Sequence, residues 1–176
     1  MTDNWIYIYD NDKIRYVLGE KGKNPLICIG VNSSTAKPNN LDRTLTKVKN
    51  ISINNKYDGW IMLNLFPLRE TKPNNLPKDK HNYETIIEKN IKEIKKIIQN
   101  YPNSDILCCW GSVIEKREYL KESLLKLCNE ILYSKKNKLK CVDLTKNKQH
   151  PRHPLYCKKS SILQIFNIYN YIYLAK

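Results

Sequence analysis

The chain has 176 residues, 41% of them hydrophobic and 27% charged, a balance typical of one globular domain and not of a disordered chain. No apolar run approaches the roughly 20 residues that a membrane-spanning helix needs, and the first residues lack the basic and then apolar pattern of a secretion signal. We therefore expect a single domain over residues 1–176 that stays in the cytoplasm and enters no membrane.

The net charge of +14 comes from 31 Lys and Arg residues against 17 Asp and Glu residues. A positive field attracts polyanions, so this charge favours a nucleic-acid partner. Most of the excess is Lys in a chain that is also rich in Asn and Ile, a combination that an AT-rich genome produces through codon bias. Charge alone therefore favours nucleic acid only weakly over an ordinary solvated surface.

The six cysteines do not suggest a disulfide framework. Cys28, Cys108, Cys109 and Cys141 lie in apolar runs, Cys128 lies on a helix face, and none has the paired spacing of a zinc site. We expect buried, reduced thiols, no metal site and no cofactor, with an iron–sulfur cluster as the alternative.

In chain order, the sequence predicts alternating strands and helices. Two β-prone runs within residues 1–20 flank Asp10-Asn11-Asp12 and predict a hairpin. Continuous apolar runs or helical periodicity then predict a strand at 26–31, a helix at 41–54, a strand at 60–65, a loop at 67–77, a helix at 83–101, a strand at 105–110, a helix at 113–133, a strand at 139–144 and a C-terminal helix at 160–176 capped by Ser160 or Ser161.

This alternation predicts an α/β fold, a three-layer αβα sandwich with a mostly parallel four-stranded central sheet plus the N-terminal hairpin. In such sheets ligands bind beyond the carboxyl ends of the strands. The polar residues that follow the strands lie within residues 26–156 and are the candidate site, at 32–35, 64–69, 111–112 and 146–156.

Two asparagines end the first two central strands. Gly30 permits close backbone approach, and the amide of Asn32 can hold a water or a base edge, although the same residues also suit an ordinary turn. Asn64 stands in an otherwise apolar strand end, where it either reads a base edge or ties neighbouring loops together. Phe66 is a candidate stacking surface or a core residue.

A histidine loop follows the fourth strand. Pro151 and Pro154 stiffen the segment around Arg152 and His153. A fixed His can donate to a developing anion and an Arg can bind phosphate bidentately, while the alternative is a stiff surface turn.

In order, these segments read Gly30-Val31-Asn32-Ser33-Ser34-Thr35-Ala36, Asn64-Leu65-Phe66-Pro67-Leu68-Arg69, Trp110-Gly111 and Arg152-His153-Pro154-Leu155-Tyr156. The pattern resembles an uncharacterised bacterial and phage family known as domain of unknown function 1643. More remotely, it is similar to the uracil-DNA glycosylase superfamily, which has a Gly-x-Asn-Pro or Gly-x-Asp-Pro loop and a later His-Pro loop.

The second resemblance implies roles for these residues. Asn32 would position the attacking water, Asn64 would read the edge of a flipped base, and His153 would stabilise the departing base anion. Gly30, Ser33 and Phe66 would also contact the base. Residues expected along the DNA backbone are Ser34, Thr35, Arg69, Ser112, Lys146, Arg152, Leu155 and Tyr156, of which Leu155 or Tyr156 would wedge into the duplex.

Three features depart from that superfamily. Ser33 stands in place of Pro, Leu155 stands in place of Ser, and no carboxylate occupies the water-activating position, which predicts slow or specialised chemistry. A modified base therefore joins uracil as an expected substrate.

The sequence thus favours a monomeric, DNA glycosylase-like hydrolase that acts on a flipped uracil or modified pyrimidine in single- or double-stranded DNA. One rival is a non-catalytic domain that binds a nucleotide or nucleic acid in the same cleft. The other is a hydrolase or transferase acting on a free nucleoside or nucleotide.

Overall fold

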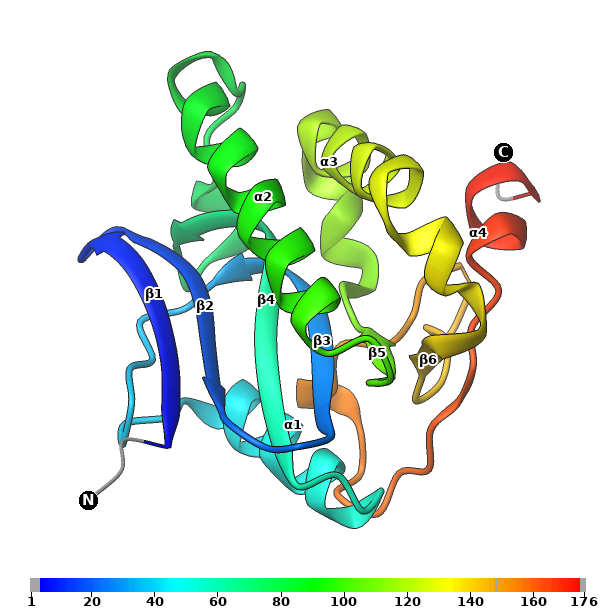
Figure 1. Ribbon diagram of the computed structural model, residues 1–176. Coiled ribbons are helices and arrows are strands. Elements are labelled where there is room, and N and C mark those ends of the chain that lie inside the picture. Colours follow the sequence, from blue (N-terminus) through cyan, green and yellow to red (C-terminus); the bar gives the residue numbers. More distant parts are fainter. Residues whose placement is uncertain (1–3, 148, 175–176) are drawn as a thin grey trace.

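Four parallel strands form the centre of the computed structural model, which describes residues 4–147 and 149–174 (Figure 1). They are β3 (Pro25–Ser33), β4 (Gly59–Arg69), β5 (Ile106–Cys108) and β6 (Leu139–Cys141). Their order is β4-β3-β5-β6, and each pair of neighbours runs parallel. They coincide with the four central strands predicted from the sequence, and β3, β4 and β5 are almost continuously buried, as expected for strands that are covered on both faces.

Antiparallel strands extend this sheet on both sides. In the described chain it has seven strands in the order β1-β2-β4-β3-β5-β6-β7, so the expected four-stranded sheet is too small. The added strands are β1 (Trp5–Asn11), β2 (Ile14–Glu20) and β7 (Gln164–Ile165). The hairpin β1–β2 is confirmed from residue 5 onward, and β2 pairs with β4 because an open strand edge offers unpaired N–H and C=O groups.

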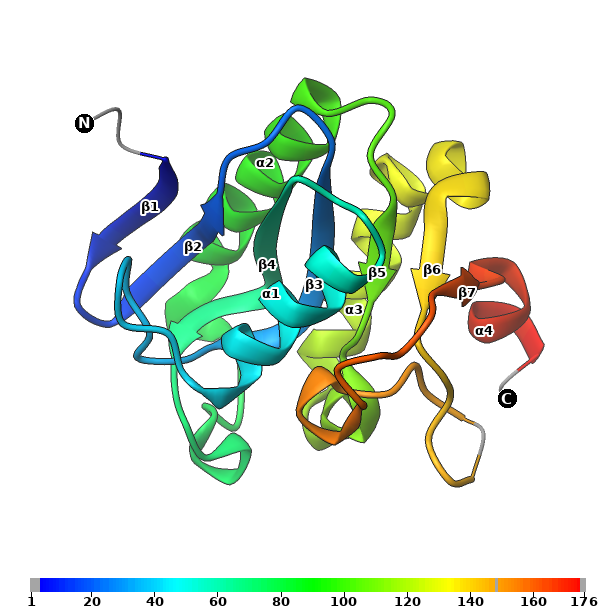
Figure 2. The same cartoon turned by 90° about the horizontal axis from the view of Figure 1, so that it is seen from below.

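Helices cover both faces of the sheet. They are α1 (Arg43–Asn54), α2 (Glu84–Asn100), α3 (Glu118–Glu130) and α4 (Ile168–Leu174). Figure 2 shows α1 on one face and α2 and α3 on the other, with α4 beside β6 and β7. Within the described residues, no helix combines the length and apolar character needed to cross a membrane.

Short 3-10 helices occupy several connections. They are η1 (Pro73–Asn75), η2 (His81–Tyr83), η3 (Gly111–Lys116), η4 (Leu132–Lys138) and η5 (Pro154–Tyr156). The helix expected at residues 113–133 is therefore α3 alone, flanked by η3 and η4.

Alternation along each strand produces a separate core on each face. Ile27, Ile29 and Leu63 pack toward α2 and α3, whereas Cys28 and Met62 pack toward α1. Neighbouring residues of a strand point to opposite faces, so β3, β4 and β5 each contribute to both cores. All six cysteines are free and buried, as expected from their settings.

The C-terminal segment differs from its prediction as a helix over 160–176. Residues 164–165 form β7, and the helix begins only at Ile168. Phe166 N donates to Leu139 O at 2.9 Å, so hydrogen bonds to the open edge of β6 replace a helical turn here. Residues 175–176 lie outside the described chain, as do residues 1–3 of the predicted hairpin segment.

A buried asparagine fastens α2 to β4. Asn90 is fully buried on the apolar face of α2, and its Nδ2 donates to Asn64 O at 2.7 Å and to Leu65 O at 3.3 Å. These bonds satisfy backbone carbonyls at the end of β4, next to the candidate site.

We expect Asn90→Ala to lower the free energy of unfolding by about 1–3 kcal/mol, because buried carbonyl groups lose their donor. Urea denaturation measures this change. Glu88→Ala, at an exposed position of the same helix, is the matched control and should stay within about 0.5 kcal/mol of the wild type. Equal stability of Asn90→Ala and Glu88→Ala would contradict the assigned contact.

Candidate functional site

A cavity of about 580 Å³ lies beyond the carboxyl ends of the central strands. Ten of the residues predicted for the site line it, namely Gly30, Asn32, Ser34, Asn64, Ser112, Lys146, Arg152, His153, Leu155 and Tyr156. The loops that follow β3, β4, β5 and β6 therefore converge, as the placement of ligand sites in parallel sheets predicts.

Phe66 does not line this cavity. Its ring is fully buried and contacts the rings of Tyr83 and Tyr119, with centroids 5.5 Å and 5.1 Å away. Strand β4 continues to Arg69, so Phe66 is still inside the sheet and faces the core. A stacking role for Phe66 has no support from this position.

Ser33, Thr35 and Arg69 also lie outside the cavity lining. Strand β3 extends through Ser33, whose buried hydroxyl donates to Arg15 O at 2.8 Å. Thr35 is exposed, and Arg69 donates to Ala36 O at 3.2 Å and to the hydroxyl of Tyr7. Arg69 therefore holds the loop that follows β3 through Ala36, Ser33 lies in the strand beneath that loop, and Thr35 lies on its exposed side.

The floor of the cavity contains a buried amide with an unused acceptor. Asn64 is 1% exposed, and its Nδ2 donates to Ser33 Oγ at 3.3 Å, while Oδ1 has no hydrogen-bond partner. A Cβ at Gly30 would lie 2.9 Å from this Oδ1 and 2.5 Å from Met62 Cε. The missing side chain at Gly30 therefore leaves room beside Asn64 Oδ1, and an N–H donor is the partner that this buried acceptor lacks.

Asn32 is fixed through its amide nitrogen. Its Nδ2 donates to Glu70 O at 2.6 Å and to Ser33 O at 3.1 Å. These bonds leave Oδ1 without a partner among the described residues, and the side chain is half-buried in the cavity wall. Asn32 thus presents a carbonyl oxygen that can accept a hydrogen bond from water or from a ligand.

The histidine of the Pro-rich loop has a defined tautomer. His153 Nδ1 accepts a hydrogen bond from Leu155 N at 3.3 Å, so the ring proton of the neutral imidazole lies on Nε2. Burial lowers the pKa of His153, while the Asp42 carboxylate acts weakly in the opposite direction. At neutral pH the cavity therefore contains an uncharged Nε2–H donor.

Gly111 makes room for this loop. Its φ is +60°, and a Cβ added there would lie 3.2 Å from His153 Cβ. Gly111 N also donates to Pro151 O at 2.9 Å. The glycine after β5 therefore sets the position of the His153 loop through both its conformation and its missing side chain.

A second histidine anchors the same loop from behind. His150 is 5% exposed, with Nδ1 2.8 Å from Tyr171 Oη and Nε2 3.5 Å from Glu115 Oε1. Tyr171 Oη also accepts from Trp110 Nε1 at 3.0 Å. No sequence pattern singles out His150, because its partner Tyr171 lies in α4 and only the fold brings the two together.

Three charged residues of the cavity were not predicted. Arg15, Asp42 and Glu70 all line it. Arg15 is 1% exposed; burial, with a smaller effect of the Arg69 cation, lowers its pKa to about 10, so it stays charged at neutral pH. Its signal in the sequence was a single cation within the apolar run of β2.

The two carboxylates have local roles that the sequence only partly suggests. Asp42 Oδ1 accepts from Leu45 N at 2.8 Å and caps α1, a role that its position before the helix favours. Glu70 Oε1 accepts from Lys72 N at 2.8 Å. Although no carboxylate stands beside Asn32 in sequence, the fold places these two acids in the wall of the same cavity.

Among the described residues, no three or more His, Cys, Asp and Glu side chains are grouped so that they could hold a metal ion. The cavity is instead lined by amides, hydroxyl groups, one imidazole and charged side chains from several loops. Such a lining suits recognition of a polar organic ligand through hydrogen bonds.

We expect Gly111→Ala to lower the free energy of unfolding by about 1–2 kcal/mol, because the residue must adopt a left-handed conformation beside His153. Denaturant titration measures the loss, and the imidazole NMR signals of His153 should shift. Ser112→Ala, at the exposed neighbouring position, should change stability by less than about 0.5 kcal/mol. Unchanged stability and signals in Gly111→Ala would refute this role.

Stability should fall as the pH decreases from 7 to 5. Burial lowers the pKa of both His150 and His153 in the folded state. On acidification the unfolded chain binds protons first, near its ordinary His pKa of about 6.5. The free energy of unfolding therefore becomes smaller as the pH falls. Urea titrations at several pH values measure the slope, which should be shallower in His150→Gln. A flat or rising stability on acidification would exclude the effect.

The comparisons with known proteins agree with the motif order. A family model described as "Protein of unknown function (DUF1643)" matches residues 15–155. No curated protein and no solved structure matches the chain. The matched range begins at Arg15 and ends at Leu155, so it contains the cavity residues from the end of β3 to the His153 loop. This chain belongs to the DUF1643 family of proteins of unknown function.

Proposed function

We propose that the protein is a DNA glycosylase-like hydrolase that cleaves the N-glycosidic bond of a flipped uracil or modified pyrimidine. One observation carries the proposal: a single cavity contains a neutral imidazole N–H donor, a buried amide acceptor without a partner and a second, fixed amide oxygen. The first two groups have the polarity needed by a base that presents both a carbonyl oxygen and an N–H group.

The assigned roles follow from what each group can donate or accept. Asn64 Oδ1 accepts from the N–H of the base, and Asn32 Oδ1 accepts from the attacking water. The water oxygen bonds to C1′ of the sugar while the C1′–N bond breaks and its electron pair remains on the base. His153 Nε2–H donates to the base oxygen where negative charge develops, which stabilises the leaving anion.

The proton released from the water has acceptors nearby. Asp42 and Glu70 place carboxylates in the cavity wall, and Glu70 is also the residue whose backbone carbonyl holds Asn32 in place. These acids offset the missing carboxylate beside Asn32, and they would also stabilise positive charge that develops on the sugar.

The rim of the cavity and the architecture of the sheet also support the proposal. Tyr156 is 73% exposed at the rim of the cavity, next to half-buried Leu155, so this tip is available to enter a base stack. Four parallel strands with helices on both faces support the proposed relation to the uracil-DNA glycosylase superfamily.

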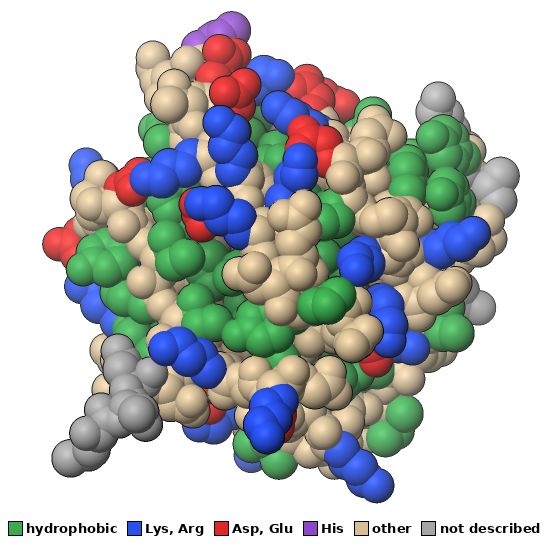
Figure 3. All heavy atoms as spheres, in the orientation of Figure 1, with side chains coloured by type: hydrophobic (Ala, Val, Ile, Leu, Met, Phe, Trp, Pro, Cys, Tyr) green, Lys and Arg blue, Asp and Glu red, His purple; other side chains and the backbone are tan. Residues whose placement is uncertain are grey.

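The excess positive charge of the chain does not form a continuous basic patch on the face of α2 and α3. Figure 3 shows Lys and Arg side chains there interleaved with Asp and Glu, and Lys95 of this face pairs with Glu130 at 2.8 Å. We therefore propose that Lys146 and Arg152, two of the cationic residues that line the cavity, bind the DNA backbone. The net charge as a whole does not carry this role.

The proposal predicts that His153→Ala lowers the rate of base excision by about 10²–10³-fold, the usual cost of losing one donor to a developing anion. Asn32→Ala should also lose excision, and both variants should bind DNA nearly as well as the wild type. The assay presents duplex and single-stranded oligonucleotides that contain uracil, damaged bases or phage-type modified bases, and reveals abasic sites by alkali cleavage.

His81→Ala is the matched control, because His81 is exposed on η2 and does not line the cavity. It should excise at the wild-type rate. Wild-type excision by His153→Ala would remove the assigned role. Intact DNA across the whole panel would instead favour a domain that only binds its ligand, for which Asn64→Ala should still weaken binding.

A further inference from the structure

Arg15 is a buried cation that lacks a counter-ion. Its Nη1 donates to Ala36 O at 2.8 Å and to Ser34 O at 3.4 Å, but Nε is buried without a hydrogen-bond partner. The guanidinium lies in the cavity lining and is 1% exposed. Burying a charge without an opposite charge destabilises the folded protein, so this arrangement indicates that a ligand supplies the negative group.

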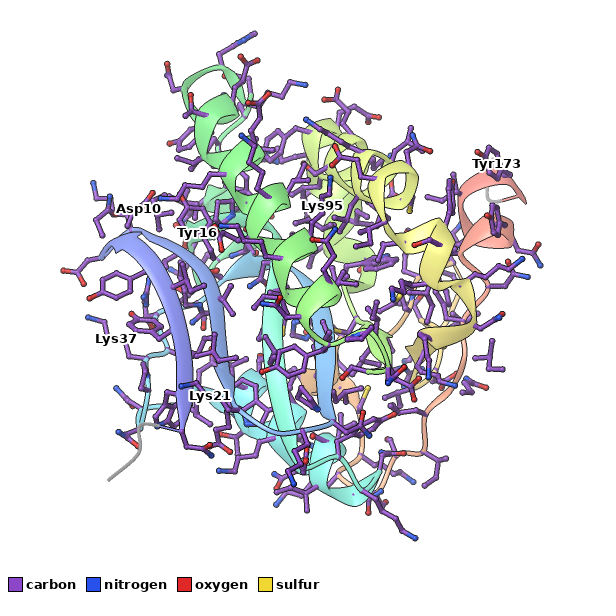
Figure 4. The ribbon with its side chains drawn as sticks, in the orientation of Figure 1. Asp10, Tyr16, Lys21, Lys37, Lys95 and Tyr173 are labelled. Carbon is purple, nitrogen blue, oxygen red and sulfur yellow. The ribbon has the colours of Figure 1, made fainter. Side chains whose placement is uncertain are left out.

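The carboxylates of the neighbouring hairpin are engaged elsewhere. Asp10 accepts from Tyr16 and from Lys89, and Asp12 pairs with Lys37 at 3.0 Å. Figure 4 shows Asp10 and Tyr16 near the turn of the hairpin, with Lys37 farther along beside β1. None of these acids forms an ion pair with Arg15, although it lies on the same hairpin.

The acids of the cavity do not neutralise Arg15 by direct contact either. Asp42 Oδ1 is held by the amide of Leu45 at 2.8 Å, and its carboxylate acts on the pKa of Arg15 only as a lesser effect after burial and Arg69. Glu70 uses Oε1 for the amide of Lys72. Neither carboxylate hydrogen-bonds to the guanidinium.

A second guanidinium lies beside Arg15, and the Asp12 carboxylate acts on it only at a distance. Arg69 Nη1 donates to Ala36 O at 3.2 Å, so Arg15 and Arg69 share one carbonyl acceptor. Arg69 Nε is also buried without a partner, and its head group lies 5.8 Å from the centroid of the Tyr7 ring. Two cations side by side repel each other unless an anion joins them.

The same cavity contains both kinds of unused group. Asn64 Oδ1 lacks an N–H donor, whereas the buried Arg15 guanidinium, with Nε unpartnered, lacks an anionic acceptor. Ser33 joins the two, because its hydroxyl donates to Arg15 O and accepts from Asn64 Nδ2. A ligand with a base N–H and a phosphate satisfies both sets, and the planar guanidinium matches phosphate oxygens bidentately.

We propose that Arg15, supported by Arg69, is a phosphate-binding site inside the cavity and that the ligand is a phosphorylated nucleotide unit rather than a free nucleoside. The base contact rests on the proposed function, whereas the phosphate contact rests on the two arginines alone. Phosphate can come from the DNA backbone or from a free nucleotide, and the two sources can be separated by experiment.

The test uses the full chain and measures its thermal unfolding midpoint in increasing inorganic phosphate, with chloride at equal ionic strength as reference. Phosphate should raise the midpoint with saturation, because a ligand that binds only the folded state stabilises it. Arg15→Met should abolish the phosphate-specific increase. In Arg15→Lys the half-saturating phosphate concentration should rise about tenfold or more, since a hydrogen-bonded charged contact is lost.

Lys92→Met is the matched control, because it removes one positive charge from an exposed position of α2 outside the cavity. It should respond to phosphate as the wild type does. If Arg15→Met fails to fold, Arg15→Lys still decides the question. An equal response to phosphate and chloride in the wild type, or an unchanged response in Arg15→Lys, would overturn the inference.

Two further ligands identify the source of the phosphate. Deoxyuridine 5′-monophosphate and a single-stranded oligodeoxynucleotide are titrated against wild type and Arg15→Lys, with deoxyuridine as the unphosphorylated reference. Arg15-dependent binding of the nucleotide indicates a free nucleotide, and Arg15-dependent binding of the oligonucleotide alone indicates a phosphodiester. Deoxyuridine binding as tightly as its monophosphate would count against the site.

These measurements require no turnover, so the two proposals fail separately. Phosphate stabilisation that depends on Arg15, in a protein that forms no abasic sites, would retain the phosphate site and remove the glycosylase. Excision without any Arg15-dependent phosphate effect would do the reverse.

Discussion

The pairing of Gly30 with Asn64 across β3 and β4 is the constraint on which the cavity depends. The missing side chain at Gly30 leaves space in which a buried amide can face the cavity, and any Cβ there would collide with Met62 or Asn64. Asn90 holds the backbone of Asn64 from α2, and Ser33 holds its side chain from β3. Sheet register, helix docking and the cavity floor are therefore one connected arrangement, and a shift of one strand by a single residue would disrupt all three.

The parts of the fold that could be predicted are those with a strong local pattern. Continuous apolar runs identified the four parallel strands, and the isoleucine spacing identified α2 within one residue at each end. The site was predictable to a similar depth, because ligand-binding residues follow strands in such sheets. That rule alone predicts that Asn32, Asn64 and His153, which lie at or after the ends of three different strands, share one cavity, and all three line it.

The remainder depends on contacts between distant segments. The sequence does not show that β2 pairs with β4 or that β7 pairs with β6, since both pairings use backbone groups that every residue carries. The sequence leaves Phe66 open between a stacking surface and a core residue, and the continuation of β4 to Arg69 places it in the core. Arg15 lies 15 residues before the Gly30 motif and reaches the cavity only through the β2–β4 pairing, so no motif includes it.

The contact between His150 and Tyr171 has a consequence for the biosynthesis of the protein. Tyr171 follows His153 by 18 residues, and it is the group that joins His150 to Trp110. At about 5–20 residues per second, the ribosome completes the loop roughly one to four seconds before it adds this anchor. Until Tyr171 has been added, the hydroxyl that joins His150 to Trp110 is missing, so the histidine loop cannot reach its final arrangement before α4 is synthesised.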